Sequence, residues 1–542
     1  MRFKIIGLCL IGLVLSSSAL LYDRYFEITK NIEIFANVYK EINSNYVDQT
    51  DPSKLMKAGI DAMLNTLDPF TNYISEAQIE SYRINVEGRY NGVGARAKKM
   101  GDYVTITEIY KDYPAYKAGL KVGDQVIAVN GQSAKGKESE DLYQIMRGIP
   151  KSDVDITIIR PGVPGQQSLK LVRDEVNIPN VPYSGMISEG IGYLILTSFT
   201  ENAGSHVQAA VKKLKEENPN LKGIIFDLRD NGGGLLHEAV EVCNTFIAQG
   251  QLIASTRSKA KERDQYFKTT RPAVDEIIPV VVLINNKSAS ASEIVSGSIQ
   301  DLDRGVLIGQ ISYGKGLVQN TKDVGYNAKV KLTISKYYIP SGRCIQSVHY
   351  DNGQPVHLPD SLRVPFKTKN GRLVYDGGGV KPDLELAEAI NPIIVQKLLD
   401  DNWIFNFCTV WSLKNPAPNE ARNFEFVAFD DFLAYLKKEK FDDLSALELK
   451  LKEFESEAKK EKASEFYGEV ESMHKQLQLK QWLDINENKQ LISNLIEEEI
   501  VGRVFFEEGK IQKRLAHDKL IAEAKLLIND RKKYDSILVP GK

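Results

Sequence analysis

The chain has 542 residues, a length that corresponds to roughly three to four domains of ordinary size. Hydrophobic residues make up 42% and charged residues 26%, and the formal net charge is −2, which excludes a strongly basic nucleic-acid-binding protein and an extensively disordered one. Four cysteines exclude a disulfide-stabilised scaffold, and six histidines leave few ligands for a metal enzyme.

The N-terminus has the pattern of an export signal. Arg2 and Lys4 precede an apolar run from Ile5 to Leu21 that is interrupted only by glycine and three serines. The small residues Ser17–Ala19 offer a cleavage site, although the run is also only slightly shorter than the ~20 residues of a spanning helix. We expect residues 1–24 to be a signal peptide or a membrane anchor, and the protein to be exported to a bacterial periplasm or to the periplasmic face of the inner membrane.

A helical segment is predicted for residues 25–84. An apolar stripe recurs there at helical spacing, and the dipeptide Asp68-Pro69 supplies a stop signal. The stripe consists of Leu55, Ala58, Ile60, Met63 and Leu64.

Residues 85–174 are predicted to form a small module rich in β-strands. The stretch Tyr113–Gly131 combines a short helix, a glycine turn and a strand that ends on Asn-Gly, and it closely resembles the core of PDZ domains. Such domains add a peptide strand to a sheet edge and hold its free C-terminus in a glycine-rich loop. The backbone of Gly92, Val93 and Gly94, just before a strand, can form this carboxylate nest.

Residues 175–390 alternate between buried strands and amphipathic helices, which predicts an α/β layer fold. An Asn-Gly turn also predicts a hairpin over Phe366–Tyr375. The predicted strands are Gly192–Phe199, Gly223–Leu228, Pro279–Ile284 and Val306–Gly309, with a helix over Ser205–Glu217.

Three glycines end the strand within Phe226–Gly234, and a helix follows over Leu235–Phe246. Backbone N–H groups exposed there would line an oxyanion hole, or the glycines form only a tight strand-to-helix turn. His237, just inside the helix, is the one candidate for a Ser–His pair, although its position favours a packing or surface role.

Ser288, Ser290 and Ser292 lie between the strand that ends at Ile284 and a following helix. A serine at such a junction lies at the carboxyl edge of a sheet, where the N–H groups of the helix N-terminus would stabilise an oxyanion. The same residues also suit ordinary helix capping, with Glu293 in the first turn. Spacing alone does not choose among the three serines.

Lys315 lies between Gly314 and Gly316. If this lysine is buried without a carboxylate, desolvation lowers its pKa, and the neutral amine can activate a nearby serine as general base. Gln319 would orient the amine without adding charge. A solvated lysine on a surface turn is the alternative. Gly309–Gly316 also nearly matches a phosphate-binding loop, but Gly316 stands where that motif needs Ser or Thr.

Residues 391–542 are predicted to form a helical domain. Charged residues separate an apolar stripe at helical spacing, which suits a surface for an adaptor or for self-association, or the plain packed face of a helical domain. The stripe consists of Leu444, Leu447, Leu451, Phe454 and Ala458.

Together these motifs resemble the C-terminal processing peptidases, also called tail-specific proteases, over roughly Tyr46–Leu386. The interval of 25 residues between Ser290 and Lys315 fits that family. The resemblance implies a multidomain α/β (α+β) fold, in which an α/β serine-protease core carries an inserted PDZ domain, a helical N-terminal segment and a helical C-terminal domain. The shared blocks are Leu67–Pro69, the PDZ-like module, Asp227–Arg229 with its glycines, Ser288–Glu293, Gly314–Gly316 with Gln319, Tyr337–Arg343 and Gly379–Asp383.

The resemblance assigns Ser290 as the nucleophile, Lys315 as the general base and Gln319 as the support of the lysine. The N–H groups of Gly233 and Ala291 would line the oxyanion hole. It implies an exported serine endopeptidase that recognises unstructured C-terminal segments of proteins through its PDZ domain and needs no metal, organic cofactor or nucleic acid. The competing hypothesis is a catalytically inactive adaptor that binds C-terminal peptides and in which Ser290 only caps a helix.

Overall fold

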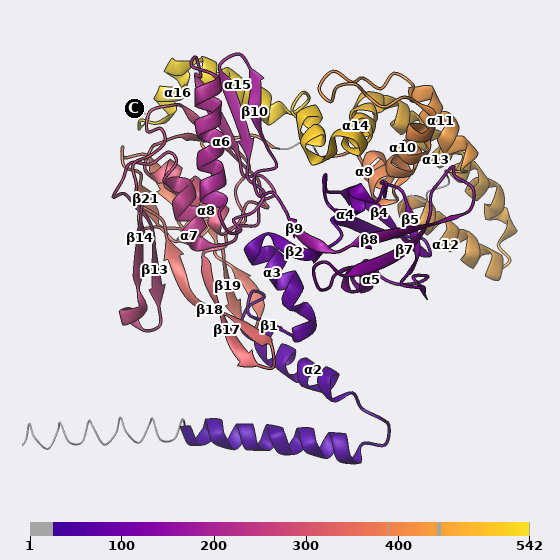
Figure 1. Cartoon of the computed structure of the whole chain (residues 1–542), viewed down its shortest axis with the longest axis horizontal. Coiled ribbons are helices and arrows are strands. Elements are labelled where there is room, and N and C mark those ends of the chain that lie inside the picture. The colour runs from indigo at the N-terminus through magenta and orange to yellow at the C-terminus, as the bar shows by residue number, and fades with distance from the viewer. Residues whose placement is uncertain (1–24, 388–389, 442–445, 541–542) are drawn as a thin grey trace, which may run out of the picture. The chain divides into compact units, whose positions relative to one another are not determined.

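The computed structural model describes residues 25–387, 390–441 and 446–540 (Figure 1). The expected export segment, residues 1–24, lies outside the described residues. No helix in the described ranges is long and apolar enough to cross a membrane. The chain forms two compact units: a smaller unit of the N-terminal part up to Ile79, Gln319–Ile334 and His349–His357, and a larger unit of Glu80–Val318, Ser335–Val348 and the part from Leu358 onward.

The smaller unit begins with a helix over residues 25–45 and α2 (Pro52–Leu64). Asp51 caps α2 by accepting hydrogen bonds from the N–H groups of Ser53 and Lys54. The helical prediction is wrong at β1 (Asn72–Ile74), which pairs antiparallel with β18 (Ala328–Tyr338), a partner that local sequence does not reveal. It is confirmed again from Ile79, where α3 (Ile79–Glu87) begins. The strands β17 (Leu317–Gly325) and β18 pair, as do β19 (Val348–Asp351) and β20 (Gln354–His357).

The larger unit starts with α3 (Ile79–Glu87) and the PDZ-like module. Its sheet has the order β3-β4-β5-β7-β8, so β3 is an edge strand. Its core consists of buried side chains of the strands together with Leu142 of α5. The strands β2 (Arg89–Gly92) and β9 (Asp174–Asn177) pair at the entry and exit of the module, which explains how it is inserted between neighbouring parts of the chain. The elements are β3 (Ala95–Met100), β4 (Tyr103–Ile109), α4 (Pro114–Lys117), β5 (Gln125–Val129), β6 (Gln132–Ser133), α5 (Ser139–Met146), β7 (Asp153–Ile159) and β8 (Gln166–Val172).

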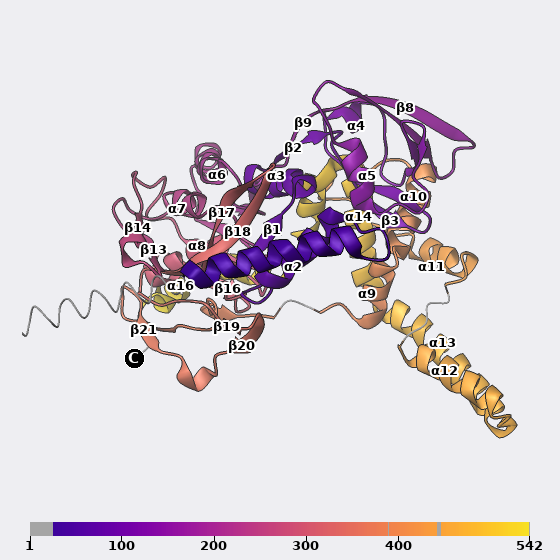
Figure 2. The same ribbon diagram turned by 90° about the horizontal axis from the view of Figure 1, so that it is seen from below.

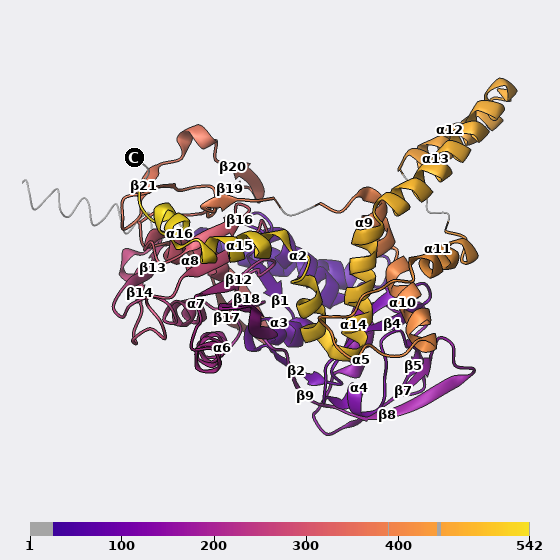
Figure 3. The ribbon, with the colours of Figure 1, turned by 90° about the horizontal axis from the view of Figure 1, so that it is seen from above.

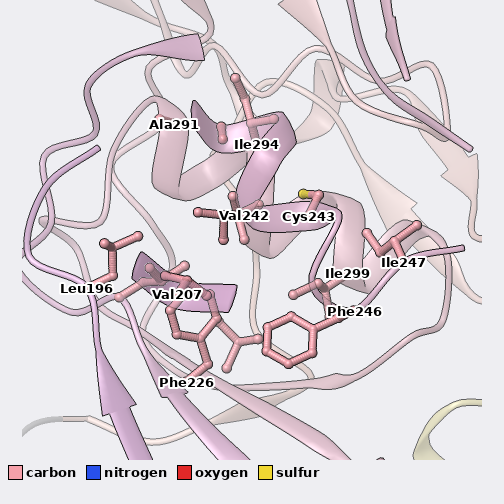
Figure 4. Packing of buried hydrophobic residues seen from close by; sticks show 14 of the residues in the cluster. Leu196, Val207, Phe226, Val242, Cys243, Phe246, Ile247, Ala291, Ile294 and Ile299 are labelled. Carbon is pink, nitrogen blue, oxygen red and sulfur yellow. The ribbon is translucent and has the colours of Figure 1, made fainter. Parts of the chain in front are cut away.

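A second sheet of the larger unit confirms the α/β prediction. Its order is β10-β11-β12-β15-β16-β23, and all neighbouring pairs except β10–β11 are parallel. Alternate residues separate to opposite faces: Ile224 and Phe226 pack with α6, α7 and α8, whereas Ile225 packs with α15. Figure 4 shows Phe226 in one cluster with Val207 of α6 and Val242 of α7. The elements are β10 (Tyr183–Ser188), β11 (Ile191–Ile195), α6 (Ala203–Glu217), β12 (Gly223–Asp227), α7 (Leu236–Cys243), β15 (Val280–Ile284), α8 (Ala291–Asp301), β16 (Val306–Gly309), β23 (Leu384–Glu385) and α15 (Lys519–Asn529).

Smaller strand pairs complete this part of the chain. The strand β13 (Leu252–Ser258) pairs with β14 (Gln265–Lys268) and with the last residues of β18. The strands β21 (Pro365–Lys367) and β22 (Leu373–Tyr375) form the predicted hairpin, with Gly371 at φ +95°. The hairpin prediction is therefore confirmed.

The C-terminal helices divide between a core of their own and the α/β sheet. Helices α12 and α13 lie side by side and extend away from α9 (Figures 2 and 3). Helix α14 has non-helical dihedral angles at Phe506, φ 57° and ψ −156°, and the chain then reaches α15 on the sheet. Of the predicted stripe, Leu444 lies outside the described residues and Leu447 is 65% exposed. The remaining helices are α9 (Ile393–Asp400), α10 (Trp403–Lys414), α11 (Phe429–Lys438), α12 (Ala446–Lys460), α13 (Tyr467–Glu487), α14 (Lys489–Arg514) and α16 (Arg531–Ile537).

Arg229 ties the glycine loop after β12 to α15. Its guanidinium contacts the carboxylates of Asp227 at 2.6 Å and Asp518 at 2.7 Å, and all three side chains are largely buried. Asp518 also caps α15 by accepting hydrogen bonds from the N–H groups of Leu520 and Ile521. One carboxylate therefore serves both the helix and the buried arginine.

We expect Asp518→Ala to lower the free energy of unfolding by about 2–3 kcal/mol, because it removes a helix cap and leaves Arg229 with one carboxylate fewer. Asp530→Ala is the matched control, since exposed Asp530 caps α16 through Lys533 N–H without a buried arginine, and should cost only about 1 kcal/mol. Urea unfolding followed by circular dichroism measures both. Equal losses in the two variants would contradict the role of Arg229.

Candidate active site

Ser290 occupies the junction between β15 and the fully buried helix α8. The strand ends at Ile284, and the helix begins at Ala291, so Ser290 is its N-cap residue. Its φ of 56° and ψ of −112° are unusual for a residue with a side chain. Strained backbone of this kind persists only where surrounding contacts hold it, and such residues cluster at functional sites.

The three candidate serines differ in exposure and hydrogen bonding. The hydroxyl of buried Ser288 donates to Leu228 O at 2.8 Å, and that of buried Ser292 donates to Asn231 O at 2.8 Å. Their protons are therefore used within the protein. Ser290 is the one of the three that is partly exposed.

The carboxylate of Glu293 binds the serine segment and the lysine segment together. Its Oε2 accepts hydrogen bonds from the N–H groups of Ser290 at 2.8 Å and Lys315 at 2.9 Å. Its Oε1 accepts from the Ser312 hydroxyl at 2.5 Å and from Gly314 N–H at 2.6 Å. Burial raises the pKa of Glu293, and these four hydrogen bonds oppose that shift.

Tyr337 on β18 joins the same two segments from their carbonyl groups. Its hydroxyl lies 3.1 Å from Ser290 O and also contacts Lys315 O, so its single proton is shared between the two carbonyl oxygens. Burial raises the pKa of Tyr337 well above its usual value, so the hydroxyl keeps its proton as a donor. Ser290 and Lys315 are thus brought together at their N–H groups by Glu293 and at their carbonyl groups by Tyr337.

The glycine loop after β12 lies against this junction. A Cβ on Gly233, which has φ +98°, would lie 2.8 Å from Ser290 Cβ and 2.9 Å from Ala291 N. Only glycine allows this approach. Gly233 N–H donates to Asn231 Oδ1 at 2.9 Å, whereas Ala291 N–H has no hydrogen-bond partner in the described part of the chain.

Two further candidates take no part in these hydrogen bonds. Gln319 belongs to β17 in the smaller unit, and its Nε2 donates to Thr333 Oγ1 at 3.2 Å. His237 is 67% exposed on α7, which agrees with a surface role. The phosphate-loop alternative for Lys315 is wrong, because a strand rather than a helix begins at Leu317 and the anion-binding helix N-terminus is missing.

Sequence reasoning assigned no catalytic-site role to Glu293 or Tyr337. Its place in the first helical turn predicts only a capping residue at Glu293, and the structure confirms that it caps α8. The further role follows from its complete burial in the fold, because a buried carboxylate requires several donors. Tyr337 begins the motif block Tyr337–Arg343, but the block does not reveal its role, since its partners are 47 and 22 residues away.

The predicted peptide loop of the PDZ-like module is buried, and Gly92 belongs to β2 rather than to a loop. Val93 O and Gly94 O accept hydrogen bonds from Ala115 and Tyr110, whereas the N–H groups of Val93 and Gly94 have no partner among the residues that the structure describes. Hydrogen-bonded C=O groups beside N–H groups without a partner in the described ranges suit the binding of a carboxylate.

Side chains of α5 cover the adjacent edge strand β3. The Tyr143 hydroxyl contacts Ala97 N at 2.7 Å and Ala97 O at 3.0 Å, and Ser139 Oγ accepts from Lys99 N–H at 3.0 Å. An edge strand needs such partners because its backbone groups are otherwise unpaired.

Two other kinds of site are relevant to the serine junction: a metal-binding cluster of side chains and a cavity near it. Within the described ranges, no group of three or more His, Cys, Asp or Glu side chains could hold a metal ion. A cavity of about 570 Å³ lies between the PDZ-like module and the C-terminal helices, with Tyr116, Trp411 and Phe506 in its lining, and it includes none of the predicted catalytic residues.

Three parts of the chain match known protein families. Residues 190–352 match peptidase family S41, residues 105–160 match the PDZ domain, and residues 394–528 match the C-terminal helical domain described for probable PDZ-proteases.

Individual proteins show the same likeness. The carboxy-terminal-processing protease of Bartonella bacilliformis is 35% identical over 321 residues, which cover 59% of this chain and 73% of that protein. A probable CtpA-like serine protease of Staphylococcus aureus is 32% identical over 357 residues, which cover 65% of this chain and 70% of that protein. Among solved structures, the photosystem II D1 C-terminal processing protease aligns with 24% identity and a TM-score of 0.36, over 66% of this chain and 93% of that chain. The identity to curated proteases extends over more than two thirds of their length, so the chain belongs to the carboxy-terminal-processing proteases of peptidase family S41, a family of serine proteases with a PDZ domain.

Proposed function

We propose that this protein is an exported endopeptidase that binds the C-terminal segment of a protein substrate through its PDZ domain and cleaves it through an acyl-enzyme on Ser290, with Lys315 as general base. The observation that carries the proposal is the double bridge by Glu293 and Tyr337, which holds the serine and lysine backbones side by side. Export is inferred only from the sequence of residues 1–24.

In each of the two stages of the proposed reaction, Lys315 first takes a proton from the nucleophile and then gives it to the leaving group. The neutral Lys315 amine takes the hydroxyl proton of Ser290 as the oxygen attacks the substrate carbonyl carbon. The resulting ammonium gives that proton to the leaving amine nitrogen, and the peptide bond breaks. A water molecule then gives a proton to the neutral Lys315 amine as its oxygen attacks the ester carbon. The resulting ammonium returns that proton to Ser290 Oγ as the ester C–O bond breaks, which releases the acid and restores the serine hydroxyl.

The N–H groups of Ala291 and Gly233 are proposed to stabilise the oxyanion. The unpaired N–H of Ala291 at the start of α8, within the part of the chain that the structure describes, supports this role. Gly233 N–H is donated to Asn231 Oδ1, so a substrate oxygen would have to replace that acceptor. Gln319 is proposed to support Lys315, because an amide orients the amine without adding charge.

The PDZ domain is proposed to bind the substrate C-terminus at the edge of β3, with the carboxylate at the N–H groups of Val93 and Gly94. The unused N–H groups and the edge position of β3 support this. A peptide strand would have to displace the Tyr143 and Ser139 side chains from β3.

The arm formed by α12 and α13 is proposed as the surface for an adaptor or for self-association. Large apolar side chains are exposed along it, which supports a contact role. These side chains are Leu447, Phe454, Met473, Leu479 and Leu483.

We expect Ser290→Ala and Lys315→Ala each to lower kcat by about 10³-fold or more, because each removes one half of the proton-transfer pair. Mass spectrometry of a substrate with an unstructured apolar C-terminus measures cleavage, and Ser205→Ala at an exposed position of α6 is the control. A fluorophosphonate probe should label the wild type at Ser290. Wild-type turnover in either folded alanine variant would refute the proposal, and a folded wild type with neither labelling nor cleavage would favour the adaptor hypothesis.

We expect Glu293→Gln to lower kcat at least about 100-fold, because an amide nitrogen cannot accept hydrogen bonds from two of the four donors. Each unsatisfied buried donor costs about 1–3 kcal/mol, so the melting temperature should fall as well. Glu217→Gln on the exposed face of α6 is the control. A kcat within fivefold of the wild type would show that the bridge is not needed.

The same carboxylate predicts the pH dependence. Because burial raises the pKa of Glu293, acidification should protonate it at a higher pH than an exposed glutamate and so remove acceptor capacity at the site. Protonation of the Lys315 amine acts in the same direction. Activity of the wild type should therefore rise with pH through the acid range, as a pH profile of kcat measures, and a flat profile would contradict both assignments.

We expect Tyr143→Phe to tighten peptide binding about threefold to tenfold, because the peptide no longer has to displace the hydroxyl from Ala97. Fluorescence anisotropy with a labelled peptide that has an apolar C-terminal residue and a free carboxylate measures the Kd. The amidated peptide and Tyr103→Phe are the controls. Unchanged or weaker binding would place the peptide elsewhere than at β3.

A further inference from the structure

We propose that Asp68, more than 200 residues before the lysine, is a positioning residue for proteolysis, which acts through the Thr333 hydroxyl on the amide of Gln319. The inference rests on the proposed support of Lys315 by Gln319. It adds a role for the Asp68-Pro69 segment of the smaller unit and for a threonine on β18 that no motif singled out.

Asp68 is the acceptor of a compact hydrogen-bond cluster. Its Oδ1 accepts from the N–H groups of Phe70 and Thr71, both at 2.9 Å, and from Thr333 Oγ1 at 3.2 Å. Its Oδ2 accepts from Thr71 Oγ1 at 3.1 Å. Asp68 is only 9% exposed, so this acceptor is shielded from water that could replace it.

The single hydroxyl proton of Thr333 sets the direction of the hydrogen bonds that link Gln319, Thr333 and Asp68. A hydroxyl has one proton, and a carboxylate can only accept, so the Thr333 proton is donated to Asp68. Thr333 Oγ1 therefore offers only a lone pair to Gln319 on the neighbouring strand β17. The contact at 3.2 Å requires the amide nitrogen of Gln319, not its oxygen, on the side of Thr333.

This fixed orientation decides what Gln319 can do. With Nε2 bound to Thr333, Oε1 is the end of the amide that can accept a hydrogen bond from an amine or an ammonium. No partner of Oε1 is present in the described part of the chain. The Thr333 backbone is held as well, because its N–H donates to Thr71 Oγ1 at 3.1 Å. A flipped amide would have N–H groups in place of Oε1 and could not accept a hydrogen bond from an amine.

The primary test compares Thr333→Val with Thr333→Ser. Valine keeps the shape but removes both the donor to Asp68 and the acceptor for Gln319, so we expect kcat to fall at least tenfold with KM within twofold. Serine keeps the hydroxyl and should restore at least half of kcat. Asn320→Ala, an exposed neighbour of Gln319, is the control for effects on β17. Circular dichroism and the melting temperature check folding.

A double-mutant cycle separates positioning from plain stability. In a Gln319→Ala background, Thr333→Val should cause no further loss of kcat, because the amide that it orients is gone. The same tenfold loss in both backgrounds, or a Thr333→Ser variant as impaired as Thr333→Val, would overturn the inference.

Asp68→Ala is the second variant, in case Thr333→Val does not fold. This substitution removes the acceptor of the Thr333 proton, which is then free to be donated to Gln319 Oε1 and reverses the amide of Gln319. We expect the same loss of kcat as for Thr333→Val. Because Asp68 also accepts hydrogen bonds from two backbone N–H groups and Lys331 lies in its electrostatic field, the threonine pair stays the primary test. Inactive Ser290→Ala and Lys315→Ala with fully active Thr333→Val and Asp68→Ala would refute this inference alone, whereas active Ser290→Ala or Lys315→Ala would refute the proposed function itself.

Discussion

The buried carboxylate of Glu293 is the interaction on which the candidate site depends. Its two oxygens accept four hydrogen bonds, and the donors come from three places in the chain: Ser290, Ser312 and the Gly314–Lys315 segment. A buried charge is stable only with such partners, so each donor is required by the carboxylate as much as the carboxylate is required by the donors. The strained backbone at Ser290 is held in the same way, since its N–H and C=O both have fixed partners.

The α/β sheet provides the frame for this carboxylate. The strands β12 and β15 are neighbours and parallel, so their carboxyl ends lie at the same edge, and the glycine loop meets the start of α8 there. Helix α8 is buried along its whole length, which fixes its N-terminus and the Ala291 N–H. On the opposite face, α15 covers the sheet (Figure 3). It is joined to the glycine loop through the ion pair of Arg229 and Asp518. Helix α15 is therefore part of the scaffold of the α/β sheet.

The PDZ domain shows how an edge strand can be protected and still be usable. Tyr143 and Ser139 satisfy backbone groups of β3 with side chains, which a peptide strand can replace one for one. The N–H groups of Val93 and Gly94 have no such substitute within the described ranges. The C-terminal carboxylate of a peptide would then bind to N–H groups that have no other partner within the described ranges. Along β3, by contrast, the peptide backbone would replace the hydrogen bonds of Tyr143 and Ser139.

The sequence by itself determined the elements that depend on local patterns. Apolar runs predicted β12, β15 and β16, the spacing of Ser205–Glu217 predicted α6, and the Asn-Gly turn predicted the hairpin of β21 and β22, because periodicity and turn chemistry act over a few residues. The motifs also predicted the family, which the comparisons with curated proteases confirm. Other features appear only in the tertiary structure. One is the strand β1, and another is the donation of the Ser288 and Ser292 hydroxyl protons to backbone carbonyl groups. The contacts of Glu293 and Tyr337 with the serine and lysine segments, and the link from Asp68 through Thr333 to Gln319, belong to the same group. These features depend on hydrogen bonds between residues far apart in the chain, and such bonds leave no periodic trace because only folding brings the donor to its acceptor.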